Sequence, residues 1–129
     1  MAQNKLKILV LDDEPIVCKR LKPSLERQGY AVDTFTHSLE ALQAVTDTKY
    51  DLIITDLKME GLDGMRFLQK AKSLHPEVEV IVITGFATME TAKESFKKGV
   101  FDFIAKPFSL SEIQQVVIRA EAKIRGERR

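Results

Sequence analysis

Apolar runs typical of buried strands alternate with helix-like segments along this whole chain. Four of the runs end in or next to polar residues, and they read KILVLDD at 7–13, YDLIITD at 50–56, VEVIVIT at 78–84 and VFDFIAKP at 100–107. Three of them are nearly continuous in Val, Ile and Leu, which suits strands buried on both faces. The alternation therefore predicts a parallel sheet covered by helices.

The helix-like segments complete the pattern. They begin near Pro15, Ser38, Gly64, Thr88 and Ser109. A further strand, YAVDTF at 30–35, gives five βα units. Short right-handed connections between such units predict an α/β fold with a doubly wound sheet. Units of this number and size fit the flavodoxin-like strand order 2-1-3-4-5 with five helices, in which ligands bind at the carboxyl ends of the strands.

Composition limits the classes of protein that this chain can be. Its 129 residues suit one domain, so an output domain would lie elsewhere. The 20 basic and 19 acidic residues give a net charge of +1, and no nucleic-acid-binding surface is expected. Neither a membrane span nor a signal peptide is visible, which predicts a cytoplasmic protein without membrane contact. His37 and His75 lack partners at metal-ligand spacing, Cys18 is expected to be a semi-buried thiol of the first helix, and we assign them no chemistry.

Polar residues gather at the predicted carboxyl edge of the sheet. Asp12, Asp13, Asp56, Thr84 and Lys106 stand at or just past the ends of four apolar runs. The strand order places the first and third strands side by side, so the three carboxylates should converge. Two carboxylates about 4 Å apart repel by roughly 4 kcal/mol at an effective dielectric near 20, so the cluster needs protons or a cation. Oxygen ligands select a hard cation, and we predict a Mg²⁺ site.

This set of residues suits phosphoryl transfer, which needs an in-line nucleophile, a metal and fixed donors. Asp56 is the best nucleophile, because Asp12 and Asp13 are better placed to hold the metal. Lys106 and Thr84 supply an ammonium and a hydroxyl beside the carboxylates. The sequence therefore favours a phosphoryl group carried on Asp56.

Two other functions for this edge of the sheet agree less well with the sequence. A phosphatase that passes through a phosphorylated aspartate would need a second carboxylate two residues after the nucleophile, where this chain has Lys58. A flavodoxin-type site would need a phosphate loop rich in Ser, Thr and Gly after the first strand, where this chain has LDDEP.

The motifs LDDE, ITDLKM, VIVITGFAT and FIAKPF occur in this order, and with them the chain resembles the receiver domain of bacterial two-component response regulators over roughly residues 5–124. The resemblance implies that Asp56 is the phosphoacceptor and that Thr84 and Lys106 bind the phosphoryl oxygens. It also implies that Asp12, Asp13, Asp56 and the backbone carbonyl of Lys58 hold Mg²⁺. Such a domain is a regulator rather than an enzyme, although it assists its own phosphorylation and dephosphorylation.

The resemblance extends to switching. It implies a cis Lys106–Pro107 bond and a switch in which Thr84 moves toward the phosphoryl group and Phe103 turns inward. The partner would be a sensor histidine kinase, or a small phosphodonor in its place. The surface of the fourth helix, fifth strand and fifth helix would then control a homodimer or an output domain.

The surface expected to respond carries apolar and charged residues. Met89, Ala92 and Phe96 lie beside Lys93, Lys97 and Lys98, and Asp102 and Glu112 are candidates for charged contacts across a dimer. Two sequence segments, DLKMEGLDG and TGFATMETA, are most similar to receivers of enhancer-binding activators. Those activators also carry an ATPase and a DNA-binding domain.

We expect a receiver domain over residues 1–124, with 125–129 as a tail or the start of a linker. The alternative is a degenerate receiver that acts as a docking module without phosphorylation.

Overall fold

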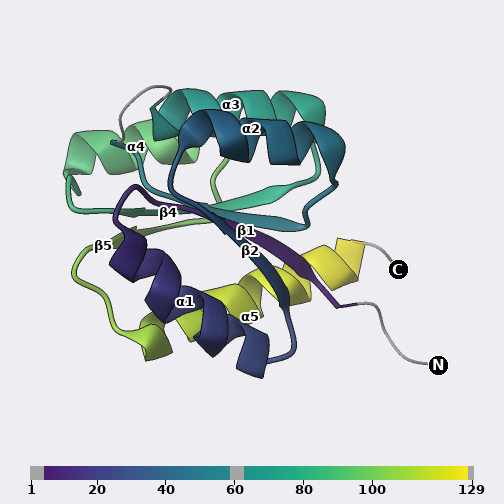
Figure 1. The fold of residues 1–129 in the computed structure, drawn as a ribbon. Coiled ribbons are helices and arrows are strands. Elements are labelled where there is room, and N and C mark those ends of the chain that lie inside the picture. The colour runs from purple at the N-terminus through teal and green to yellow at the C-terminus, as the bar shows by residue number, and fades with distance from the viewer. Residues whose placement is uncertain (1–4, 59–62, 128–129) are drawn as a thin grey trace.

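The computed structural model describes residues 5–58 and 63–127, and in this part of the chain strands and helices alternate as predicted (Figure 1). The elements are β1 Lys7–Leu11, α1 Pro15–Arg27, β2 Ala31–Phe35, α2 Ser38–Asp47, β3 Leu52–Thr55, α3 Gly64–Leu74, β4 Glu79–Thr84, α4 Met89–Lys97, β5 Asp102–Ala105 and α5 Leu110–Glu127. The five-stranded sheet is parallel in the order β2-β1-β3-β4-β5, which confirms the predicted fold class.

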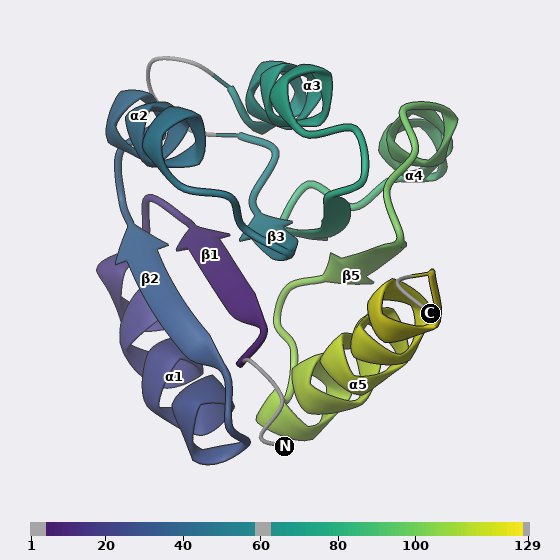
Figure 2. The same ribbon diagram turned by 90° about the vertical axis from the view of Figure 1, so that its right-hand side faces the viewer.

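Helices cover both faces of the sheet, with α1 and α5 on one side and α2, α3 and α4 on the other (Figures 1 and 2). Alternate residues of β1 therefore enter different cores. Ile8 and Val10 pack with α1 and α5, whereas Leu9 and Leu11 pack with α2 and α3. This two-sided burial explains why the central runs lack the polar alternation of a half-exposed strand.

The helix starts agree closely with the sequence prediction. Helices α1, α2 and α3 begin at the predicted residues, and α4 and α5 begin one residue later. The difference at α4 and α5 arises because Thr88 and Ser109 lie just before the first helical residue. The hydroxyl oxygen of Thr88 accepts from the Thr91 amide at 3.0 Å, and that of Ser109 accepts from the Glu112 amide at 3.1 Å, as expected for residues that cap a helix.

The last helix continues to Glu127, three residues beyond the predicted domain end at residue 124. Ile113, Val116, Val117, Ala120 and Ile124 form its buried stripe, as the spacing of apolar residues predicts. Within the described ranges no helix combines the length and apolar character needed to cross a membrane.

Candidate functional site

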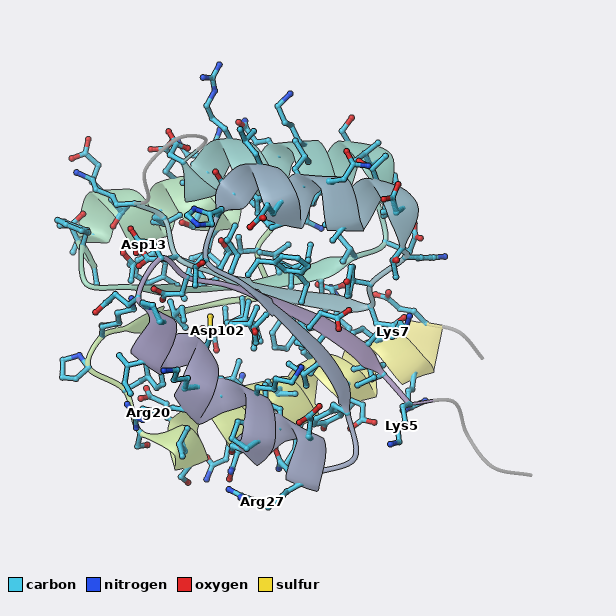
Figure 3. The ribbon with its side chains drawn as sticks, viewed as in Figure 1. Lys5, Lys7, Asp13, Arg20, Arg27 and Asp102 are labelled. Carbon is cyan, nitrogen blue, oxygen red and sulfur yellow. The ribbon has the colours of Figure 1, made fainter. Side chains whose placement is uncertain are left out.

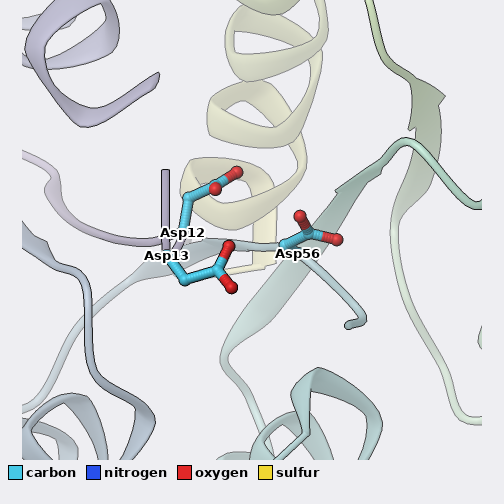
Figure 4. Close-up of side chains that lie close together, drawn as sticks. All are labelled: Asp12, Asp13 and Asp56. Carbon is cyan, nitrogen blue, oxygen red and sulfur yellow. The ribbon is translucent and has the colours of Figure 1, made fainter. Parts of the chain in front are cut away.

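Three aspartates meet at the carboxyl edge of the sheet (Figure 4). Asp12 and Asp13 directly follow β1, and Asp56 directly follows the neighbouring strand β3. One carboxylate oxygen from each lies within 4.8 Å of those of the other two. Figure 3 shows Asp13 near the first turn of α1, whereas Lys7 lies at the opposite end of β1. The predicted convergence of the three carboxylates is therefore confirmed.

Backbone amides orient two of these carboxylates. Asp12 Oδ1 accepts from the Glu14 amide at 2.9 Å, which fixes the turn into α1. Asp56 Oδ1 accepts from the amides of Leu57 at 2.6 Å and Lys58 at 3.3 Å. The turns after β1 and β3 therefore hold one oxygen of each of these carboxylates with local hydrogen bonds.

Lys106 brings the last strand into the cluster. Its ammonium nitrogen lies 2.7 Å from Asp12 Oδ2, 2.7 Å from Glu14 Oε1 and 2.9 Å from Asp56 Oδ2. The Lys106–Pro107 bond is cis, as the resemblance implied. Burial alone would lower the pKa of Lys106, but the three neighbouring carboxylates outweigh burial and raise it above its ordinary value. The ammonium therefore stays charged at neutral pH.

Burial acts against the ionised form of Asp12. Its side chain is completely buried, and burial raises the pKa of the carboxyl group even though Lys106 and the Glu14 amide act in the opposite direction. Oδ2 lies 2.7 Å from the Lys106 ammonium as an ion pair, but it has no hydrogen-bond partner within the described ranges. An orphaned buried carboxylate oxygen beside two further aspartates is the donor set that a hard divalent cation needs.

Thr84 and Phe103 lie on β4 and β5, the two strands beyond β3 in the sheet. Thr84 is the last residue of β4 and is fully buried, and its hydroxyl oxygen accepts from the Phe86 amide at 3.1 Å. Phe103 lies on β5 opposite Val82 and is half-buried against the core of the α2 and α3 face. Thr84 therefore ends its strand at the edge that carries the aspartates, whereas Phe103 lies within β5.

Lys58 contributes to the site with its backbone. Its amide donates to Asp56, as described above, while its ammonium lies 4.6 Å from the centre of the Phe86 ring. This cation–π contact keeps the charged end of the side chain over an aromatic ring that is about half exposed.

Two residues that matter to the site were not predicted. Glu14 reaches Lys106 across 92 positions of sequence, and only the tertiary structure reveals that contact. Gly64 begins α3, and a Cβ at this position would overlap the backbone carbonyl of Asp56. A Gly at the predicted helix start was a signal for close backbone approach, although it did not identify the segment that approaches.

Comparison with known proteins agrees with this architecture. Residues 8–118 match the family of response regulator receiver domains. The transcriptional regulatory protein ZraR of Salmonella typhimurium is 33% identical over 125 residues, which cover 97% of this chain and 28% of that protein. The chain thus spans little more than a quarter of that relative's length.

Solved structures of response regulators have the same fold as this chain. A CheY-like response regulator receiver domain from Methanospirillum hungatei superposes with a TM-score of 0.92 at 26% identity, covering 96% of this chain and 99% of that one. A response regulator from Burkholderia pseudomallei, described with a phosphorylated aspartic acid, a calcium ion and citrate, has a TM-score of 0.82 at 28% identity and covers 96% and 73% of the two chains.

A doubly wound parallel sheet with an acidic cluster at its carboxyl edge defines the class of protein. This chain belongs to the response regulator receiver domain family, whose members are signalling switches of two-component systems.

Proposed function

We propose that this chain is a phosphorylation-dependent switch that accepts a phosphoryl group on Asp56 from a sensor histidine kinase or a small phosphodonor. The observation that carries the proposal is the position of Asp56, whose carboxylate is buried between Lys106 and two further aspartates at the ligand-binding edge of the sheet. The regulator from Burkholderia pseudomallei, which has the same fold, carries a phosphorylated aspartic acid. In this role the chain is a regulator that assists its own phosphorylation and dephosphorylation.

The transfer step uses Asp56 as the nucleophile. We assign the attack on phosphorus to Oδ2, because its partner, the Lys106 ammonium, can pass to a phosphoryl oxygen, whereas Oδ1 is held by two backbone amides. The new bond joins this oxygen to phosphorus, and the bond from phosphorus to the donor's imidazole nitrogen or acyl oxygen breaks, with the electron pair leaving on the donor. Lys106 already lies 2.9 Å from Oδ2 and would stabilise negative charge on the phosphoryl oxygens, assisted by the Thr84 hydroxyl.

The residues present fit a divalent cation. We assign Mg²⁺ to Asp12, Asp13, Asp56 and the backbone carbonyl of Lys58, because these are oxygen donors and Asp12 Oδ2 lacks a hydrogen-bond partner in the described parts of the chain. When bound, Mg²⁺ would neutralise the carboxylates and allow an anionic phosphodonor to approach. The protein's own contribution is to hold the three carboxylates together before the cation arrives.

Phosphorylation would be read out on the surface of α4, β5 and α5. Thr84 and Phe103 are suited to connect the site to this surface because β4 and β5 are paired, with Thr84 opposite Ala105. The surface includes the exposed side chains of Met89 and Phe96 on α4. Its change would control a homodimer or an output domain outside this chain.

The likeness to a transcriptional regulatory protein supports an output domain of the activator type, with an ATPase and a DNA-binding domain. On this proposal, residues 1–124 form the receiver domain and 125–129 begin a linker, which is in keeping with the continuation of α5 through Glu127.

Intact-mass spectrometry tests the proposal directly. The native chain is incubated with acetyl phosphate, with and without Mg²⁺, beside Asp56→Asn as the matched control. We expect one phosphoryl adduct on the native chain that requires Mg²⁺ and none on the variant. A native chain that gains no adduct, from either acetyl phosphate or a phosphorylated histidine kinase, would instead indicate a docking module that works without phosphorylation.

A further inference from the structure

Lys106 is held by a third carboxylate to which the proposed function gives no role. Glu14 Oε1 accepts a hydrogen bond from the Lys106 ammonium at 2.7 Å, as short as the distance from Lys106 to Asp12. The side chain of Glu14 is 57% exposed, whereas those of Asp12 and Asp56 are 0% and 6% exposed. Of these three carboxylates near Lys106, only that of Glu14 is largely exposed to solvent.

The contacts of Lys106 leave Glu14 in competition with a new ligand. An ammonium has three N–H donors, and the hydrogen bonds to Glu14 Oε1 at 2.7 Å and Asp56 Oδ2 at 2.9 Å use two of them, while Asp12 Oδ2 lies 2.7 Å away. Asp12 is the assigned metal ligand, and Asp56 Oδ2 loses its charge when it is esterified. Glu14 is therefore the charged carboxylate that remains to compete with a phosphoryl oxygen for the ammonium.

Glu14 can leave at small cost. Its backbone is fixed, because its amide donates to Asp12 Oδ1 and its carbonyl oxygen accepts from the Val17 amide at 3.0 Å. Its side chain needs only to rotate into solvent, where the carboxylate is well hydrated. Ion pairs with one exposed partner are weak, so this exchange costs less than moving either buried aspartate.

We propose that Glu14 is a positioning residue that holds Lys106 before phosphorylation and competes with the phosphoryl group for it. This proposal rests on the proposed function, since it assigns Lys106 to the phosphoryl oxygens. Glu14 thereby keeps the ammonium directed into the site in the resting protein and weakens the phosphorylated state. The action depends on direct contact with Lys106 and not only on the charge of Glu14.

The affinity for beryllofluoride, a phosphoryl mimic, tests this role without any turnover. Its dissociation constant is measured by fluorine NMR at saturating Mg²⁺ for the native chain, Glu14→Gln, Glu14→Asp and Glu40→Gln. Glu40→Gln removes the same charge from an exposed residue in the first turn of α2 and serves as the control. Asp at position 14 keeps the charge but is one methylene shorter, so it loses contact with Lys106.

We expect Glu14→Gln and Glu14→Asp to bind beryllofluoride about two- to fivefold more tightly than the native chain, with Glu40→Gln unchanged. Equal affinities for native and Glu14→Gln would overturn the competition. Tighter binding by Glu14→Gln alone, with Glu14→Asp at the native value, would show an effect of charge and overturn the role of contact. A native chain that binds no beryllofluoride would instead contradict the proposed function itself.

Discussion

At the scale of single residues, the buried carboxylate of Asp12 lowers the stability of the folded protein at neutral pH. Asp12 has no exposed surface, its pKa is raised by burial, and one of its oxygens lacks a hydrogen bond in the described residues. A folded-state pKa above the unfolded value means that ionised Asp12 opposes folding at neutral pH. This opposition disappears as the pH falls through the folded pKa and the carboxyl group becomes neutral.

Replacing Asp12 by Asn should therefore stabilise the metal-free protein. The amide has nearly the same shape and removes a buried charge, and we expect the free energy of unfolding at pH 7 to rise by about 1–2 kcal/mol. Urea denaturation without Mg²⁺ measures this difference. The gain should shrink toward acidic pH, where native Asp12 also becomes neutral.

Asp13→Asn is the matched control, because Asp13 is exposed and its ionised form is already hydrated. It should change the metal-free stability by less than Asp12→Asn. Both variants should lose the stabilisation that Mg²⁺ gives the native chain, since a ligand stabilises only the state that binds it. A metal-free Asp12→Asn less stable than the native chain would refute this account of the cluster.

At the scale of elements, polar bonds fix the C-terminal half of α5 to the opposite edge of the sheet. Lys123 Nζ lies 3.0 Å from Glu79 Oε2 at the start of β4. Tyr30 donates to Glu121 Oε1 at 2.8 Å, and Arg125 donates to the other oxygen of Glu121 at 2.8 Å. The bonds of Tyr30 and Lys123 join the final turns of the helix to the rest of the domain, whereas the Arg125–Glu121 pair lies within the helix.

Lys123→Met should measure how much the Lys123–Glu79 ion pair stabilises the protein. The variant keeps an unbranched apolar side chain but leaves Glu79, which is only 5% exposed, without its ion pair. We expect a loss of about 1–2 kcal/mol in the free energy of unfolding at pH 7. Hydrogen exchange should also increase in the last turns of α5. Lys19→Met, at an exposed position of α1, is the control.

The stability of the two proteins at alkaline pH tests whether the contact between Lys123 and Glu79 is an ion pair. The hydrogen bond to Glu79 raises the pKa of Lys123, so its stabilisation is complete below the ordinary lysine pKa of about 10.4 and is lost as the pH rises through the folded value. Native and Lys123→Met stabilities should therefore converge above that pH. A constant difference across this range would mean that the lost contact is not an ion pair.

Sequence predicts the elements well because each carries its own local signal. Near-continuous apolar runs gave the buried strands, and Thr88 and Ser109 marked two helix starts to within one residue. The aspartates were predicted to converge because parallel strands end at a common edge. The Glu14–Lys106 contact could not be predicted, because it depends on how the turns after β1 and β5 project side chains toward each other.

At the scale of the whole molecule, the carboxyl and amino edges of the sheet carry different groups of interactions. The carboxyl edge gathers charges from β1, β3 and β5, while the opposite edge fixes α5. Part of the proposed output surface is already occupied within the chain. Asp102, expected to make charged contacts across a dimer, accepts from Arg119 of α5 at 3.0 Å. A partner that binds Asp102 must therefore displace Arg119 or use both residues together.

Sedimentation measures whether the proposed switch works through self-association. With Mg²⁺ and beryllofluoride, we expect the native chain to shift from monomer to dimer, because the apolar side chains of Met89 and Phe96 are exposed and would be buried between two copies. Asp56→Asn should remain a monomer under the same conditions, and so should Met89→Ser despite binding beryllofluoride normally. If the native chain binds beryllofluoride and stays monomeric, then the α4–β5–α5 surface must act on a different protein or output domain, and phosphorylation is transmitted without a dimer.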